Sequence, residues 1–182
     1  MPYITDHQQK FTDLKYQMEN QDQLRRQANG GNSILFSYLP DEEKLYIEKA
    51  KELFSDRAAF IDVSKLLVQF IDEEGWESFS KYYNDFKNTP HLIFHSDDPK
   101  PDLFDMIIGE IEKSAQGDKI PFLIRTGSLY GTGIENINIM SHKTVMNLPH
   151  PLVIFYPSKI EGGNIFFLNF KPASKYRCAL VK

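Results

Sequence analysis

The residues best suited to chemistry lie in a glycine-rich segment, 126–133, which reads Thr-Gly-Ser-Leu-Tyr-Gly-Thr-Gly. A loop of this kind after a strand can turn several backbone N–H groups toward a phosphate. A P-loop also requires Lys and then Ser or Thr after its last glycine, where this chain has Ile134 and Glu135. The dinucleotide pattern G-x-G-x-x-G fails too, because Asn136 occupies the position of its third glycine. The segment therefore lacks the residues of either nucleotide-binding loop.

Two interpretations of this segment follow. We favour a tight turn over the edge of a sheet, since glycine is the usual residue in such turns. The alternative is a site for a nucleotide or another anion, in which Arg125 and Ser128 would assist the backbone.

Two histidines, His91 and His95, are the only pair with a spacing that suggests a metal site. On a strand they would share a face but lie roughly 13 Å apart, too far for one ion. On a helix the spacing would suit a metal, but Pro90 and Pro99 nearby disfavour a helix. The segment is predicted to be an edge strand or an extended loop, with no metal bound.

Nucleophilic and nuclease-like arrangements are incomplete as well. The chain has no G-x-S-x-G elbow, and Cys178 lies in an apolar segment without a neighbouring histidine. Asp62 stands at a strand end, but the one Glu-x-Lys triplet, Glu42 to Lys44, belongs to a helix start. We therefore predict no catalytic residue, no cofactor and no enzymatic activity.

Composition narrows the class of protein. The 182 residues are 41% hydrophobic and 25% charged, which is typical of one folded domain and not of a disordered chain. The formal charge of −4 argues against general nucleic-acid binding. No apolar run approaches the ~20 residues that span a bilayer, and the N-terminus does not resemble a secretory signal. A single cysteine excludes an internal disulfide, so a cytoplasmic location is expected.

Periodicity predicts alternating helices and strands. An amphipathic helix over 5–27 carries Phe11, Leu14, Met18 and Leu24, and Asn29 with Gly30 ends it. Asp41 is predicted to be the N-cap of a helix that ends at about Phe54. Ser64 is predicted to be the N-cap of a helix that ends at about Ile71. Further helices are expected over 76–86, 103–115 and about 141–148. Strands are expected over 33–38, 58–63, 120–126, 151–156, 164–170 and 176–181.

This order of elements predicts a single α/β domain over 1–182, with a helical segment, 1–31, packed on it. Alternating strands and helices predict parallel pairing, whereas the short connector 171–175 predicts an antiparallel pair of the last two strands. The fold class is therefore a three-layer sandwich with a mostly parallel sheet and a C-terminal antiparallel strand pair.

Four segments taken in order resemble the BrxB family of bacterial BREX phage-exclusion loci, a family of unknown function. They are 33–43 (SILFSYLPDEE), 59–67 (AFIDVSKLL), 122–130 (FLIRTGSLY) and 151–157 (PLVIFYP) with the strands after it. The resemblance implies a sheet like that of a P-loop ATPase core without the P-loop. It also implies a non-catalytic component of a defence complex, beside a PglZ-type phosphatase-like protein, a methyltransferase and a large ATPase.

Ligands of open α/β sheets gather at the carboxyl ends of the strands, so the candidate partner or ligand surface is placed there. Its residues are Arg125, Thr126, Gly127, Ser128, Tyr130, Gly131, Gly133, Tyr156 and Ser158. A tyrosine-rich recognition surface is an alternative to the expectation that most tyrosines are core or half-buried; its residues would be Tyr82, Tyr83, Tyr130, Tyr156 and Tyr176. A weaker alternative is direct DNA contact through Lys171, Lys175 and Arg177 of the basic C-terminal segment.

Overall fold

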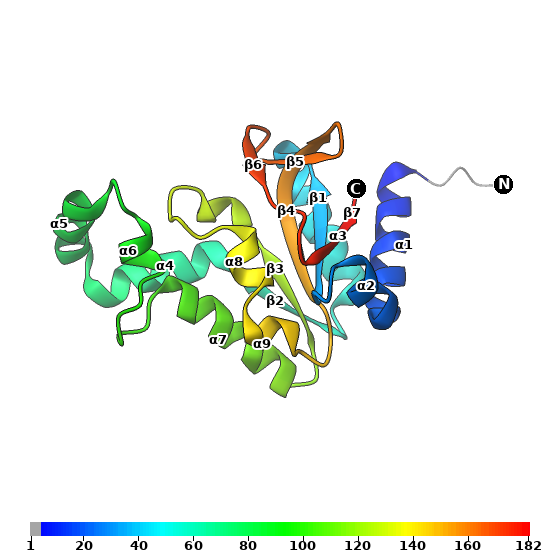
Figure 1. Ribbon diagram of the computed structural model, residues 1–182, viewed down its shortest axis with the longest axis horizontal. Coiled ribbons are helices and arrows are strands. Elements are labelled where there is room, and N and C mark those ends of the chain that lie inside the picture. Colours follow the sequence, from blue (N-terminus) through cyan, green and yellow to red (C-terminus); the bar gives the residue numbers. More distant parts are fainter. Residues whose placement is uncertain (1–4) are drawn as a thin grey trace.

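The computed structural model describes residues 5–182 and contains the predicted α/β sandwich, with helices on both faces of a mostly parallel sheet (Figure 1). Five parallel strands lie in the order β2-β3-β4-β1-β7. Their bounds are β1 Ser33–Tyr38, β2 Ala58–Asp62, β3 Ile120–Ile124, β4 Leu152–Glu161 and β7 Cys178–Val181. The central strands read as continuous apolar runs because both of their faces are covered by helices.

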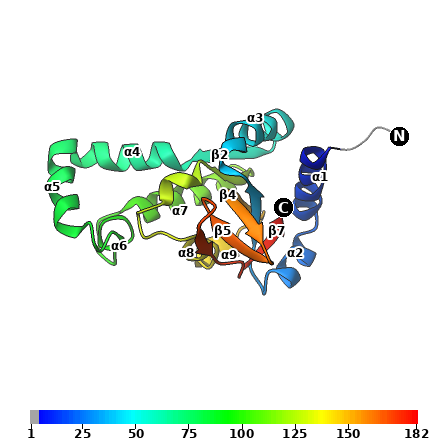
Figure 2. The same ribbon diagram turned by 90° about the horizontal axis from the view of Figure 1, so that it is seen from above.

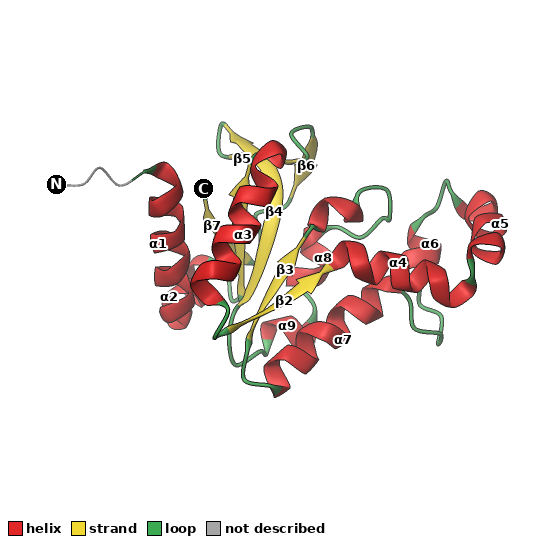
Figure 3. Cartoon of the chain, turned by 180° about the vertical axis from the view of Figure 1, so that it is seen from behind, coloured by secondary structure: helices red, strands yellow, loops and turns green. Residues whose placement is uncertain are grey.

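Alternate residues of each strand divide between two hydrophobic cores. In β1, Ile34 and Phe36 face one core, and Leu35 faces the other. The first core is aromatic: Phe155 on β4 lies 4.8 Å from Phe36 and 5.7 Å from Phe122, measured between ring centroids. These rings pack against α1 (Asp6–Glu19), α2 (Gln21–Gln27) and α3 (Glu43–Phe54), and Figure 3 shows α3 lying across the strands.

The N-terminal segment is two helices and not the single predicted one, because the backbone at Asn20 leaves the helical conformation (ψ 56°). Thr5 begins α1 with a capping box to Gln8. The predicted inward side chains of this segment are all buried in the aromatic core. The chain then turns at Asn29 and Gly30, both with positive φ, and enters β1.

The second core is mainly aliphatic and is covered by α4 (Val63–Glu74), α7 (Leu103–Gln116), α8 (Asn136–Met140) and α9 (Lys143–Met146). The predicted inward residues of α7 are buried there. Beyond the sheet, α4 continues into α5 (Trp76–Phe86) and α6 (His91–Phe94), which project from the body as an arm (Figure 2). No helix within 5–182 is long and apolar enough to cross a membrane.

Several local predictions were wrong. Residues 91–94 form a short helix and neither strand nor loop, because Pro90 lies just before the helix, where its missing N–H costs nothing. Asp62, not Ser64, caps α4, and its carboxylate accepts from the Ser64 and Lys65 N–H groups. Asp41 caps nothing, since a 3-10 turn, η1 (Pro40–Glu42), precedes α3.

The C-terminal strand pair is antiparallel, but its members differ from those predicted. β5 (Asn164–Phe167) pairs antiparallel with the end of β4 and with β6 (Lys171–Ala173). Cys178–Val181 instead adds a parallel edge strand beside β1. Positive φ angles at Leu168 and Asn169 close the β5–β6 turn early, so the connector itself becomes the third strand of the meander.

Candidate functional site

The carboxyl ends of β2 and β3 bring an ion pair to the candidate surface. Arg125 follows β3 in the left-handed conformation (φ 56°), which turns its side chain toward β2. Its Nε lies 3.1 Å from Oδ2 of Asp62, and the Arg125 side chain remains half exposed. The other oxygen of Asp62 accepts from the start of α4. The carboxylate therefore holds Arg125 in place and leaves part of the guanidinium free for a partner.

The β1–α3 connection is acidic and contains no glycine. Residues 39–42 read Leu-Pro-Asp-Glu, and Glu43 begins α3. The Tyr38 hydroxyl donates to Glu43 Oε2 at 3.0 Å. Burial, and then the neighbouring Glu43 carboxylate, raise the pKa of the Tyr38 phenol far above its usual value, so it remains a donor. These carboxylates would repel a phosphate at the helix start, where a P-loop would present N–H groups.

A shallow hollow of about 450 Å³ lies beside this connection. Its lining mixes acids and bases with one aliphatic side chain: Pro40, Asp41, Glu43, Lys44, Ile47, Glu48, Lys51 and Arg125. Charges of both signs at a solvated, open surface suit complementary contact with another protein better than enclosure of a small molecule.

The glycine-rich segment is a tight turn whose serine and threonine hydroxyl groups are used internally. It begins with a 3-10 turn, η2 (Thr126–Leu129). Thr126 donates to the Phe155 carbonyl at 2.6 Å, Ser128 to the Arg125 carbonyl at 2.7 Å, and Thr132 to the Leu129 carbonyl at 2.7 Å. These bonds tie the loop to itself and to β4. The loop therefore does not offer its serine and threonine hydroxyl groups to an anion in this conformation.

The two glycines at the end of this loop have different surroundings. Gly131 (φ 83°) borders open space, whereas Gly133 (φ 79°) approaches the backbone of His91 so closely that a Cβ would lie 3.0 Å from its nitrogen. Gly127 borders the side chains of Leu168 and Pro157. The loop is thus packed against α6 on one side and against the β5–β6 turn on the other.

Three residues of the predicted surface are buried instead. Thr126, Tyr156 and Ser158 are at most 4% exposed. The strand predicted over 151–156 would end at Tyr156, but β4 continues to Glu161 and pairs with β1 and β5 over residues 156–158. Tyr156 stacks on Phe167 at 4.7 Å, and Ser158 hydrogen-bonds Ser37 across the sheet. These three residues are therefore buried and are not available to a partner.

An exposed aromatic pair replaces them on the surface. Tyr130 is 55% exposed, Phe170 is 59% exposed, and their rings meet edge to face at 5.5 Å between centroids. Phe170 is the last residue of the strand predicted over 164–170. The early turn at Leu168–Asn169 instead ends the strand before it and leaves the Phe170 side chain exposed. We define the strand-end surface as this pair together with Arg125, the half-exposed residue that follows β3 and precedes the turn leading to Tyr130.

The tyrosines of the alternative recognition surface are also partly exposed and partly buried. Tyr82, Tyr83 and Tyr176 are exposed, so four of the five proposed recognition tyrosines reach the surface and only Tyr156 is core. They do not form one patch, because Tyr82 and Tyr83 belong to the arm and Tyr176 precedes β7. A single tyrosine-rich recognition surface is therefore not present in the described chain.

The basic C-terminal residues are engaged by the protein itself. Lys171 pairs with Glu135 at 3.1 Å, Lys175 donates to the Gly163 carbonyl at 2.7 Å, and Arg177 donates to the Asn29 carbonyl. Within 5–182, no cluster of three or more His, Cys, Asp or Glu side chains is arranged to hold a metal ion. The two histidines contact different parts of the protein: the His95 ring lies 3.9 Å from that of Phe104, between centroids, and His91 adjoins Gly133.

Cys178 is buried in β7, and burial raises its pKa to about 12. At pH 8 only about one thiol in ten thousand would then be ionised, and the thiolate is the reactive form. We expect Ellman's reagent to label the native protein at least ~1,000-fold more slowly than the protein unfolded in guanidinium, where the pKa returns to about 8.5. The measurement is absorbance at pH 8. Fast native labelling would mean that β7 detaches from β1.

Comparison of the chain with models of protein families, with curated proteins and with solved structures found no match.

Proposed function

We propose that this protein is a non-catalytic component of a bacterial phage-defence complex of the BREX type, and that it acts through protein–protein contacts. The proposal draws its biological setting from the resemblance of four ordered segments to the BrxB family. The partners it implies are a PglZ-type phosphatase-like protein, a methyltransferase and a large ATPase.

The observation that carries the contact role is the strand-end surface. Tyrosine, phenylalanine and arginine are enriched in protein interfaces, and tyrosine and arginine are among the residues that most often supply binding hot spots. Arg125 is already oriented by Asp62, so a partner would meet little cost in ordering it. The pair Tyr130–Phe170 is likewise fixed, because each ring limits the motion of the other.

Nucleotide binding is less well supported. The β1–α3 connection offers carboxylates where a nucleotide core would offer glycine N–H groups, and the serine and threonine hydroxyls of 126–133 are bonded internally. These features agree with the proposal that the sheet is related to a P-loop ATPase core that lacks its loop. Calorimetric titration with ATP or GTP at millimolar concentration is expected to give no binding heat.

The function is tested by a tagged pull-down from the native host with mass spectrometry. We expect the wild-type chain to recover a defence-complex partner, and the double variant Tyr130→Ser/Phe170→Ser to recover at least ~10-fold less of it, since hot-spot losses reach 2 kcal/mol. Tyr16→Ser is the matched control, because Tyr16 is also half exposed but belongs to α1, which Figure 1 shows on the other side of the sheet from the 126–133 loop.

The outcomes distinguish failure of the proposed function from failure of the proposed contact surface. If the wild-type chain is recovered alone, the proposed complex is contradicted. If the double variant recovers as much partner as the wild type, the strand-end surface is wrong although the complex stands. Circular dichroism of each variant controls for loss of fold.

A further inference from the structure

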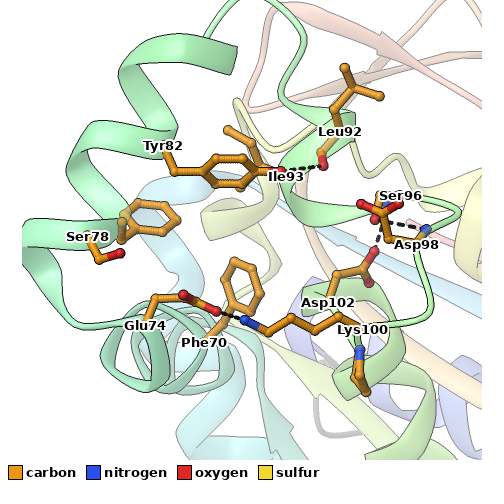
Figure 4. A pocket seen from close by; sticks show the side chains of 12 residues that line it. Phe70, Glu74, Ser78, Tyr82, Leu92, Ile93, Ser96, Asp98, Lys100 and Asp102 are labelled. Atoms are coloured by element: carbon orange, nitrogen blue, oxygen red, sulfur yellow. Dashed lines mark hydrogen bonds and ion pairs between the residues drawn. The ribbon is translucent and has the colours of Figure 1, made fainter.

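The arm formed by α4, α5 and α6 contains a pocket that has no counterpart in the proposed function. Three phenyl rings hold the arm together: Phe70 lies 6.2 Å from Phe79 and 5.7 Å from Phe94, between ring centroids. The pocket beside them has a volume of about 310 Å³ and is shown in Figure 4. Its residues are Phe70, Glu74, Ser78, Phe79, Tyr82, Leu92, Ile93, Ser96, Asp98, Lys100, Pro101 and Asp102.

The wall of the pocket is fixed by two interactions. Asp102, nearly fully buried, caps α7 through Oδ1 and accepts the Ser96 N–H through Oδ2 at 2.6 Å. Lys100 forms an ion pair with Glu74 at the end of α4, which connects the loop 95–101 to that helix (Figure 4). The pocket is therefore formed before any ligand binds, and Asp102 acts as a structural group within it.

The charge of the arm identifies the kind of occupant. Residues 70–102, which run from the second half of α4 through α5 and α6 to the start of α7, contain eight acidic residues and three lysines, a formal charge of −5, whereas the whole chain carries −4. The segment that supplies the pocket lining is therefore strongly acidic. Asp98 lines the pocket and forms no ion pair with any residue of the described chain. A cation entering the pocket would meet one unpaired carboxylate and a second, Glu74, that is shared with Lys100.

The exposed apolar side chains around the pocket indicate that the cation is part of a protein. Trp76 at the start of α5 is 70% exposed, and Tyr82, Tyr83 and Leu92 are about 40% exposed around the same arm. This surface extends beyond the pocket, and apolar patches that surround a central pocket are typical of protein interfaces. A small organic cation would fill the pocket but leave these side chains in water.

We infer that the arm binds a basic segment of a partner protein and that one arginine side chain enters the pocket. The guanidinium would lie against Asp98 and Glu74, and its aliphatic stem against Phe70, Phe79 and Tyr82. Arginine fits better than lysine because its planar, weakly hydrated group stacks on aromatic rings and pairs with carboxylates in fixed geometry. This site is distinct from the strand-end surface and does not depend on it.

Trp76 supplies the readout, because it is the only tryptophan in the chain and its ring is 6.4 Å from that of Phe79, a pocket residue. The probe is the peptide acetyl-Gly-Leu-Arg-Leu-Gly-amide, titrated to several millimolar while Trp76 emission is recorded. The matched peptide carries citrulline, which has the shape of arginine without its charge. We expect the arginine peptide to bind at least ~5-fold more tightly, and less tightly as salt increases.

Variants of the arm sharpen the test. Asp98→Asn should weaken the arginine peptide about 5-fold, as loss of a partly exposed ion pair does. Glu161→Gln, which removes one negative charge far from the arm, and Tyr130→Ser/Phe170→Ser should both leave peptide binding unchanged.

Equal binding of the two peptides, or no change in Trp76 emission at the highest concentration, would overturn the inference. So would sedimentation showing a dimer of this chain that Asp98→Asn dissociates, since the occupant would then be a second copy.

Discussion

Replacing Phe155 by alanine should lower the free energy of unfolding by about 3–5 kcal/mol, the range for large-to-small changes of aromatic residues in a core. Phe155 is fully buried on the central strand β4. Its ring contacts those of Phe36, Phe122 and Tyr38, which come from the neighbouring strands. The cavity would open where the sheet meets α1 and α3, and these side chains cannot all move to fill it.

The matched control is Phe170→Ala, which removes the same side chain from an exposed position. We expect that variant to stay within about 0.5 kcal/mol of the wild type. Equilibrium unfolding in urea measures both values. If Phe155→Ala cost no more than Phe170→Ala, the aromatic core would not be packed as described.

Gly31→Ala should destabilise the protein by about 3 kcal/mol, at the upper end of the usual cost of overpacking. A Cβ at Gly31 would lie 2.3 Å from the carbonyl oxygen of Arg177 and 2.6 Å from its Cα. The obstacle is backbone at the start of β7, which cannot rotate away as a side chain would. The clash can be relieved only if β7 moves away from β1. The two strands are paired from Ser33 opposite Cys178 to Phe36 opposite Val181.

This mechanism predicts a second effect that a simple loss of stability does not. If β7 moves, Cys178 should react with Ellman's reagent faster in Gly31→Ala than in the wild type, under conditions where both are folded. Gly109→Ala is the control, since Gly109 lies on the exposed side of α7 with nothing within 4 Å of an added Cβ. That variant should gain about 0.5–1 kcal/mol from helix propensity. Unchanged stability of Gly31→Ala would contradict the close approach of the two segments.

Local sequence was sufficient for most of the elements and for the buried faces of the helices α1 and α7. The helix and strand periods reflect interactions within a few residues, so the inward faces of α1 and α7 and the apolar strands follow from the sequence alone. The fold class follows as well, because strands that alternate with helices pair in parallel. The failure of the glycine-rich segment to match a nucleotide loop could also be read directly from Ile134 and Glu135.

The make-up of the surface depended on contacts between distant segments. Tyr156 and Ser158 are buried because β4 extends beyond its apolar run to pair with β1 and β5. Phe170 is exposed because the β5–β6 turn closes two residues before it. The acidic residues near 72–77 and 97–98 are separate in the sequence, and only the fold of α4, α5 and α6 places Glu74 and Asp98 around one pocket. Each of these features depends on pairing across the chain, which local patterns of residues do not encode.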